Sequence, residues 1–236
     1  MPRFRLALAT ALVLVATGCS ENEVRTGTDR IGSRPTQSIR DYAARVPPNT
    51  TVALRARPGG RILARVGSRT EFGSPQTLSI ALRKGAWLGV RSPALRNRQL
   101  GWVLAFALRP LKRTVRIEVD LSERTLTLIE AGVVRRREAV AIGAPGTPTP
   151  PGSFYVTDKL AGPEFGAYYG CCILALSGRQ PNLPRGWSGG DRLAIHGTPT
   201  PDYGEAVTNG CLHLPRKTLQ ALMTGVPLGT SVEIRA

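Results

Sequence analysis

The sequence predicts a mainly β protein with two β-rich parts and one short helix near the site of its chemistry. Short apolar stretches separated by turn residues fill 51–110, strict apolar–polar alternation begins at Val115, and apolar residues at helical spacing occur only over 215–224. Half-buried strands repeat every two residues and helices about every 3.6. The chain has 236 residues, 42% apolar and 20% charged, a composition that supports a folded core and excludes disorder.

Residues 1–19 have the pattern of an export signal. Arg3 and Arg5 precede an apolar stretch, 6–17, that is shorter than the roughly 20 residues needed to span a bilayer. The following Ala16-Thr17-Gly18-Cys19 resembles the bacterial lipoprotein box, which implies lipidation of Cys19. Ordinary cleavage and an uncleaved anchor are the alternatives. Each alternative predicts an extracytoplasmic protein of the cell envelope, and lipidation predicts anchoring to the outer face of the cytoplasmic membrane.

The positive charge is concentrated in the first half of the chain. The formal net charge is +16, of which +11 falls on 20–111 and +3 on 112–236, and arginine supplies most of it. Export would place the folded part outside the cytoplasmic membrane, so no nucleic-acid partner is predicted. Two interpretations stay open: solvated arginine-rich faces, or attraction to a polyanion such as a lipid surface or an acidic wall polymer.

Residues 20–50 are polar and interrupted by glycine and proline, which predicts a flexible tether. Strands are then expected over 52–57, 61–66, 77–82, 87–91 and 101–105. The segments Leu54–Pro58, Gly85–Val90 and Gly101–Val103 resemble those of bacterial SH3-like modules. This resemblance implies a small SH3-like β-barrel over 51–111. Trp87 and Trp102 are expected in its core and rim, and contact with a wall ligand is their other interpretation.

Residues 112–236 are expected to form a second, β-rich domain. Strands are predicted over 115–121, 126–128, 133–142, 154–156, 192–195 and 232–234, and one helix over Pro215–Thr224. The segment 143–152 has too many prolines for a central strand. The long stretch 158–190 reads as irregular and contains Tyr168, Tyr169 and Trp187, which suggests a lid or a substrate wall.

Cys211 and His196 are the candidates for nucleophilic chemistry. Cys211 follows Gly210 at the start of an apolar stretch, and His196 ends a predicted strand. A free thiol has a pKa of about 8.5, so a neighbouring imidazole is needed to form the thiolate that attacks. Gly210 allows the N–H groups of residues 210 and 211 to converge on an oxyanion. On composition and position alone, a structural cysteine and a structural histidine are favoured over a nucleophilic pair.

Two motifs in register resemble the YkuD-type L,D-transpeptidases. The family pattern is HG, a gap, then S/T-x-G-C, and it is matched by Ile195–Thr198 followed by Thr208–Leu212. The family's upstream segment, which contains TPxGxF, is matched by 143–154. The resemblance implies Cys211 as nucleophile, His196 as base and a backbone carbonyl near Gly197 that orients the imidazole. It implies 3→3 cross-linking of peptidoglycan stem peptides through a cysteine thioester, without cofactor or metal. A carboxypeptidase that uses water and a non-catalytic wall-binding lipoprotein are the alternatives.

This sequence departs from the family pattern at two positions. Asn209 stands where many members carry histidine, so His196 is expected to be the sole base, and His213 stands where many carry arginine. His213 could hold a substrate carboxylate only when protonated, and a structural hydrogen bond is its other interpretation. With Tyr169 and Trp187 from the expected lid, the predicted substrate-binding residues are Thr208, Asn209, His213, Tyr169 and Trp187. The oligomeric state is not indicated.

Cys171 and Cys172 are adjacent in sequence. A vicinal disulfide and two packed thiols are both compatible with an oxidising compartment. A zinc site is disfavoured because the chain has no Cys-x-x-Cys pair and no carboxylate at ligand spacing near either histidine.

Overall fold

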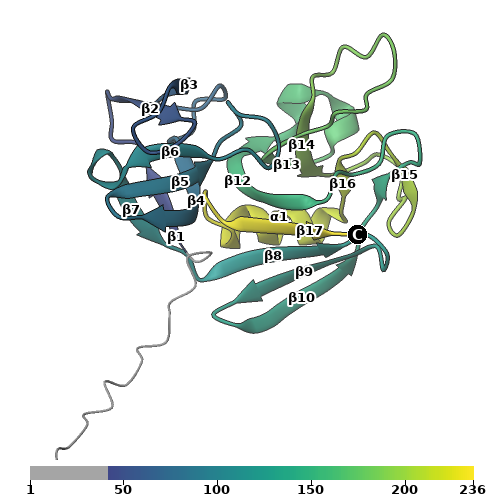
Figure 1. Cartoon of the computed structure of the whole chain (residues 1–236). Helices are drawn as coiled ribbons and strands as arrows, with labels where there is room; N and C mark the ends of the chain where they lie inside the picture. Colours follow the sequence, from purple (N-terminus) through teal and green to yellow (C-terminus); the bar gives the residue numbers. More distant parts are fainter. Residues whose placement is uncertain (1–41) are drawn as a thin grey trace, which may run out of the picture. The chain divides into compact units, whose positions relative to one another are not determined.

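The computed structural model of the chain describes residues 42–236 and shows a mainly β fold (Figure 1). The predicted signal segment 1–19, with Cys19, lies outside the described residues. Two large sheets, one two-stranded sheet and a single α-helix make up the described part of the chain. Within that part, no helix combines the length and the apolar character that crossing a membrane requires.

The first large sheet has seven strands in the order β3-β2-β6-β5-β4-β1-β7. Its strands are β1 (Tyr42–Arg45), β2 (Thr51–Arg55), β3 (Ile62–Gly67), β4 (Thr77–Lys84), β5 (Trp87–Arg91), β6 (Gly101–Leu104) and β7 (Arg109–Lys112). The five expected strands correspond to β2–β6, which confirms the alternation of strand and turn. The likeness to SH3-like modules and the boundary at residue 111 stay predictions.

The tether was expected to extend through Thr50, and this was wrong for its last residues. Strand β1 pairs with β4 on one side and with β7 on the other. Ala43 and Ala44 are fully buried there, and Val46 is buried just beyond. Ala44 and Val46 pack into the core of this sheet, and Ala43 lies against Gly229 on the other face. This burial outweighs the polar composition of the segment around them.

The second large sheet has eight strands in the order β10-β9-β8-β17-β12-β13-β14-β16. Its strands are β8 (Val115–Asp120), β9 (Thr125–Glu130), β10 (Val133–Ala139), β12 (Gly152–Ala161), β13 (Cys172–Arg179), β14 (Arg192–His196), β16 (Leu212–His213) and β17 (Ser231–Arg235). The short strands β11 (Ile142–Gly143) and β15 (Ala206–Thr208) pair separately. Strand β14 therefore lies between β13 and the short edge strand β16.

The stretch 158–190 was expected to be irregular throughout, and this was wrong. Strand β12 continues to Ala161, and β13 occupies Cys172–Arg179. Nearly every residue of β13 is buried, so its apolar run belongs to a strand covered on both faces and shows no alternation. Two shorter connections remain. The first contains the 3₁₀ turns η3 (Gly162–Phe165) and η4 (Ala167–Tyr169), and the second spans 180–191.

Helix α1 (Arg216–Gly225) covers the apolar core of the eight-stranded sheet. Figure 1 shows it in yellow alongside the strands of this sheet. Leu219 and Leu222 are fully buried in the cluster, which confirms the inward face predicted for this helix. Pro215 occupies the N-cap position, one residue before the helix. A proline there costs no helical hydrogen bond, because the first N–H groups of a helix have no partner within it.

Side chains of the first sheet's loops bind the second sheet directly. The Asn97 amide donates to the carbonyl of Arg179 at 2.7 Å, and the N–H of Arg179 donates to the Asn97 carbonyl oxygen at 2.9 Å. The Thr70 hydroxyl donates to the buried carboxylate of Asp158.

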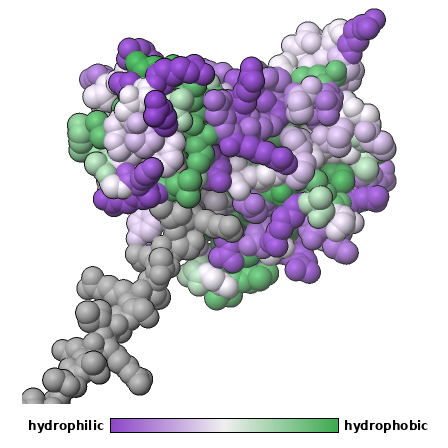
Figure 2. Space-filling model, viewed as in Figure 1, coloured by the Kyte–Doolittle hydropathy of each residue, from purple (hydrophilic) through white to green (hydrophobic). Residues whose placement is uncertain are grey.

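The face drawn in Figure 2 is mostly hydrophilic, with apolar side chains in separate patches.

Candidate active site

Parallel pairing of β14 with β16 brings the candidate residues together. Ile195 pairs with Leu212, and His196 pairs with His213. Ile195 and Leu212 are buried in the core of the sheet. Because alternate residues of a strand point to opposite faces, His196 and His213 lie on the other face, and Cys211, two residues before His213, belongs to that face as well.

One cavity is bounded by this face and by the two connections that follow β12 and β13. It is lined by Tyr168, Tyr169, Gln180, Leu183, Trp187, Gly189, Gly190, Asp191, Arg192, Ala194, His196, Asn209, Cys211 and His213. The thiol and both imidazoles thus share a single compartment. Tyr169, Trp187 and Asn209, predicted to bind substrate, are among the lining residues, and the Trp187 indole donates to the Gly190 carbonyl at 2.6 Å.

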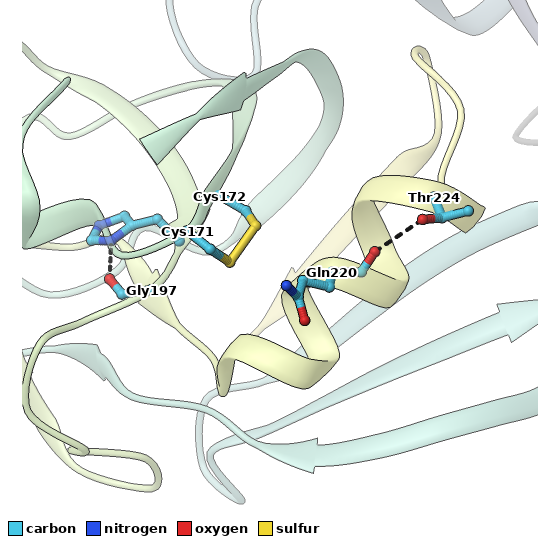
Figure 3. Close-up of a disulfide and its surroundings, with 6 residues drawn as sticks. Cys171, Cys172, Gly197, Gln220 and Thr224 are labelled. Atoms are coloured by element: carbon cyan, nitrogen blue, oxygen red, sulfur yellow. Dashed lines mark hydrogen bonds between the residues drawn. A yellow bond between two sulfur atoms is a disulfide. The ribbon is translucent and has the colours of Figure 1, made fainter. Parts of the chain in front are cut away.

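The His196 imidazole is buried and held by one backbone carbonyl. Its Nδ1 lies 2.6 Å from the Gly197 carbonyl oxygen (Figure 3), as the family resemblance implied. The Tyr169 ring meets the imidazole edge to face, with 4.9 Å between ring centroids. Burial, followed by the nearby His213, lowers the pKa of His196 to about 4. His196 is therefore neutral at pH 7, with Nδ1–H donating to Gly197 and Nε2 able to accept a proton.

The Cys211 thiol is also neutral and interacts with β14. Its Sγ lies 3.9 Å from the carbonyl oxygen of Arg192. Burial raises the pKa of the thiol to about 11. Within residues 42–236 no hydrogen bond joins this sulfur to an imidazole, so the expected thiolate–imidazolium pair is not the resting state. Proton transfer requires the thiol to leave the Arg192 carbonyl for an imidazole nitrogen.

Thr208 shapes the turn that carries Cys211 and does not line the cavity, contrary to its predicted role in substrate binding. Its buried hydroxyl donates to the Cys211 carbonyl at 2.6 Å and accepts the N–H of Gly210 at 3.0 Å. The Gly210 N–H is thus already bonded, and the expected pair of oxyanion donors is reduced to the N–H of Cys211. A short polar side chain at residue 208 closes the turn locally, as threonine does in many turns.

Gln180, which sequence reasoning missed, fixes the turn from the other side. Its Nε2 lies 3.0–3.1 Å from the carbonyl oxygens of Thr147, Pro148 and Asn209. A Cβ added to Gly210 would lie 2.0 Å from this nitrogen, so glycine is needed for the close approach. The amide thereby ties the proline-rich segment before β12 to the turn that carries the nucleophile.

The upstream threonine segment supports the same turn. The Thr149 hydroxyl donates to the Gly210 carbonyl at 3.0 Å, and the Thr147 hydroxyl donates to the Thr208 carbonyl at 2.9 Å. Both threonine side chains are buried. The TPTPPG motif therefore supports the position of Cys211 through hydrogen bonds to its turn.

His213 is a second imidazole in the cavity, next to His196. The two ring centroids are 4.5 Å apart. The Nδ1 of His213 lies 2.7 Å from the Asp202 carboxylate, and its side chain is 2% exposed. Asp202 was also missed, although a carboxylate in the loop directly after His196 was a usable signal. The structural hydrogen bond considered for His213 is therefore present, and it leaves Nε2 unpartnered.

Cys171 and Cys172 form a disulfide, and Cys211 is the free cysteine of the described residues. Figure 3 shows the disulfide beside the loop of Gly197 and the helix α1. The N–H of Gly197 donates to the Tyr169 carbonyl at 3.1 Å, so the segment before the disulfide is attached to the residue that orients His196. Among residues 42–236 no cluster of side chains suited to holding a metal ion occurs.

The comparisons with known proteins point to one family. The family model described as YkuD, the L,D-transpeptidase catalytic domain, matches residues 114–234. YkuD of Bacillus subtilis (strain 168), named as a candidate L,D-transpeptidase, is 34% identical over 121 residues, covering 50% of this chain and 64% of the relative. The protein of the same name from Bacillus licheniformis is 34% identical over 122 residues, with the same coverage. The chain thus spans less than two thirds of these relatives.

Solved structures of L,D-transpeptidases also match the chain. A crystallised mutant of the Enterococcus faecium L,D-transpeptidase is 24% identical, with a TM-score of 0.41, covering 52% of this chain and 50% of that chain. The L,D-transpeptidase from Mycobacterium smegmatis is 18% identical, with a TM-score of 0.44, covering 67% of this chain and 82% of that chain.

Proposed function

This chain belongs to the YkuD family of L,D-transpeptidase catalytic domains, and on that premise we propose that it transfers acyl groups between peptidoglycan stem peptides through a thioester on Cys211. The observation that carries the proposal is the pairing of β14 with β16. It brings His196 to the face and the cavity that hold Cys211. A nucleophile and a base delivered by neighbouring strands are what cysteine acyl transfer needs.

The proposed donor is a stem peptide with a diamino acid at position three and a terminal D-alanine. Sγ of Cys211 bonds to the carbonyl carbon that follows the L-centre of the diamino acid, and the bond to D-alanine breaks. The thiol proton passes to the base and then to the departing amine. An amine of a second stem displaces the thioester, forming a 3→3 cross-link and regenerating the thiol.

The rest state of the site is a neutral thiol beside a neutral imidazole. The pKa of Cys211 is raised to about 11, and that of His196 is lowered to about 4. Both shifts come mainly from burial, which disfavours the charged forms. We therefore place proton transfer in the substrate complex, where the developing oxyanion accepts the N–H of Cys211.

The cell envelope is the proposed location. The pattern of the signal segment is the basis for proposing that Cys19 is lipidated and anchors the protein in the membrane. Peptidoglycan is the proposed partner. Metabolic labelling with a fatty-acid probe should tag the wild-type chain and leave Cys19→Ser unlabelled. Labelling of both proteins would contradict the anchor without affecting the proposed reaction.

The proposed reaction is tested with purified tetrapeptide stems and product analysis by mass spectrometry. Wild type should form a 3→3 dimer and free D-alanine, and Cys211→Ala should form neither. A shortened monomer in place of the dimer would assign the site to a carboxypeptidase that uses water. If the stems stay intact while the protein sediments with insoluble peptidoglycan, the protein is a non-catalytic wall-binding protein, and the proposal is wrong.

A further inference from the structure

Asp202, which is partly buried, and the buried His213 form a pair with unused hydrogen-bonding capacity beside the nucleophile. Nδ1 of His213 lies 2.7 Å from Oδ2 of Asp202. The other imidazole nitrogen, Nε2, is buried without a hydrogen-bond partner, as is Oδ1 of Asp202. Buried polar atoms are nearly always satisfied in native proteins. An imidazole that lines the cavity and keeps one nitrogen free thus has an unused proton-accepting position there.

Backbone spacing keeps His213 at least as close to Cys211 as His196 is. Residues two apart on one strand lie about 6.6 Å apart along it, and adjacent strands are separated by about 4.8 Å. Cys211 and His213 follow each other on one face of the same chain segment. His196 pairs with His213 across the sheet, so it lies diagonally from Cys211, at a greater backbone separation.

The groups that face His213 come from four segments. Asp202 lies in the loop after β14, His196 on β14 itself, Tyr168 on η4, and Cys211 on the same segment as His213. Asp202 supplies the negative charge that stabilises a protonated His213. The nearby His213 also contributes to the lowered pKa of His196.

We propose that His213, oriented by Asp202, is a second proton acceptor for the Cys211 thiol, so that Cys211, His213 and Asp202 act together as a triad next to His196. This inference rests on the proposed function for its substrate. The S–H bond of Cys211 breaks as Sγ bonds to the carbonyl carbon, and the proton moves to Nε2 of His213. When the carbon–nitrogen bond breaks, the same proton passes from Nε2 to the departing amine.

Asp202 is a positioning residue in this triad. Because its carboxylate accepts the Nδ1–H of His213, it selects the tautomer with a free electron pair on Nε2. It also stabilises the imidazolium formed after proton transfer, as the aspartate of a serine triad does. Asp202→Asn keeps the size of the side chain and removes its charge, whereas Asp202→Glu keeps the charge.

The test measures alkylation of Cys211 by iodoacetamide as a function of pH, a reaction that needs no peptidoglycan substrate. Full chains are compared: wild type, His213→Gln, Asp202→Asn, Asp202→Glu and His196→Gln. Cys211→Ala gives the background from other thiols, and Glu123→Gln is the control for loss of an exposed carboxylate. Thermal unfolding shows which variants are folded.

The resting thiol of wild type is neutral, so its reaction at neutral pH should be slow but still faster than in a variant that lacks the proton acceptor. His213→Gln and Asp202→Asn should lose about 10- to 100-fold of this neutral-pH rate and react mainly at alkaline pH. Asp202→Glu should recover part of the rate, which a purely structural role would not predict. If His213→Gln does not fold, the triad is tested by comparing the neutral-pH alkylation rates of Asp202→Asn and Asp202→Glu.

The triad would be overturned if the pH profiles of alkylation for His213→Gln and Asp202→Asn superimposed on that of wild type and only His196→Gln lost neutral-pH rate. Equal rates in Asp202→Asn and Asp202→Glu would overturn the role of the carboxylate charge. These outcomes are independent of the proposed function. A wild-type enzyme that forms no dimer from stem peptides contradicts the transpeptidase assignment, while its alkylation profile still decides which imidazole receives the thiol proton.

Discussion

The imidazoles of His196 and His213 face each other across the paired strands β14 and β16, with 4.5 Å between their ring centroids. Each ring has its Nδ1 occupied, by the Gly197 carbonyl for His196 and by the Asp202 carboxylate for His213. The site therefore contains two oriented imidazoles with different partners. A neutral carbonyl contacts one ring and a carboxylate contacts the other, and burial lowers the pKa of His196.

The acid stability of the fold should depend on His196. Its pKa is lowered from 6.5 to about 4 in the folded protein, so the unfolded chain binds more protons below pH 6.5. Stability is then lost as the pH falls from 6.5 towards 4, by up to about 3 kcal/mol. Urea unfolding of wild type and His196→Gln at pH 7 and pH 4 measures this loss. The variant should lose less stability, and parallel losses in the two proteins would contradict the burial of a neutral imidazole.

Gly210→Ala should damage the nucleophile turn. Gly210 has a φ of +107°, and an added Cβ would lie 2.0 Å from Nε2 of Gln180. We expect a loss of about 2 kcal/mol in stability and at least about a tenfold slower acylation of Cys211. Gly146→Ala is the matched control, because nothing lies within 4 Å of its added Cβ. Similar acylation rates in the two variants would contradict the fit described for the turn.

Gln180→Leu should leave the carbonyls of Thr147, Pro148 and Asn209 without their shared donor. Buried acceptors without a partner cost about 1–3 kcal/mol, and the turn before Cys211 loses a support. Chemical denaturation and the acylation rate should both detect the change. Gln220→Leu, on the exposed side of α1, is the control. Gln180→Leu acylating as fast as Gln220→Leu would show that the amide does not position the nucleophile.

A count of the free thiols in the unfolded chain, before and after reduction, tests the disulfide. Among the described residues Cys211 is free, and Cys171 and Cys172 are bonded to each other. Alkylation of the unfolded, unreduced Cys19→Ser chain should label one cysteine, and prior reduction should raise the number to three. Three labels without reduction would restore the alternative of two packed thiols.

Local pattern was enough to predict most of the strands and the helix. The alternation from Val115 predicted β8, and Leu219 and Leu222 predicted the buried face of α1. Where strands are buried on both faces, alternation disappears, and β13 was therefore hidden in a stretch that looked irregular. Strand β1 was missed because only Ala43, Ala44 and Val46 mark it within a polar segment.

The motif residues Cys211 and His196 could be selected from the sequence, but their supporting contacts could not. Gln180 reaches the nucleophile turn from the end of β13, and Asp202 reaches His213 from a loop. Both contacts depend on the order of strands in the sheet, which no local pattern contains. The expected roles of Thr208 and the Gly210 N–H failed for the same reason, since their hydrogen bonds are satisfied within the folded turn.

The most direct test of the account is the intact mass of the protein after incubation with a carbapenem. A strained β-lactam carbonyl is open to attack by a cysteine nucleophile and leaves a stable covalent adduct. Wild type should gain the mass of one carbapenem, located by peptide mapping on Cys211, and Cys211→Ala should gain none. An unmodified wild type, or an adduct of equal yield on Cys211→Ala, would contradict the assignment of Cys211 as the nucleophile.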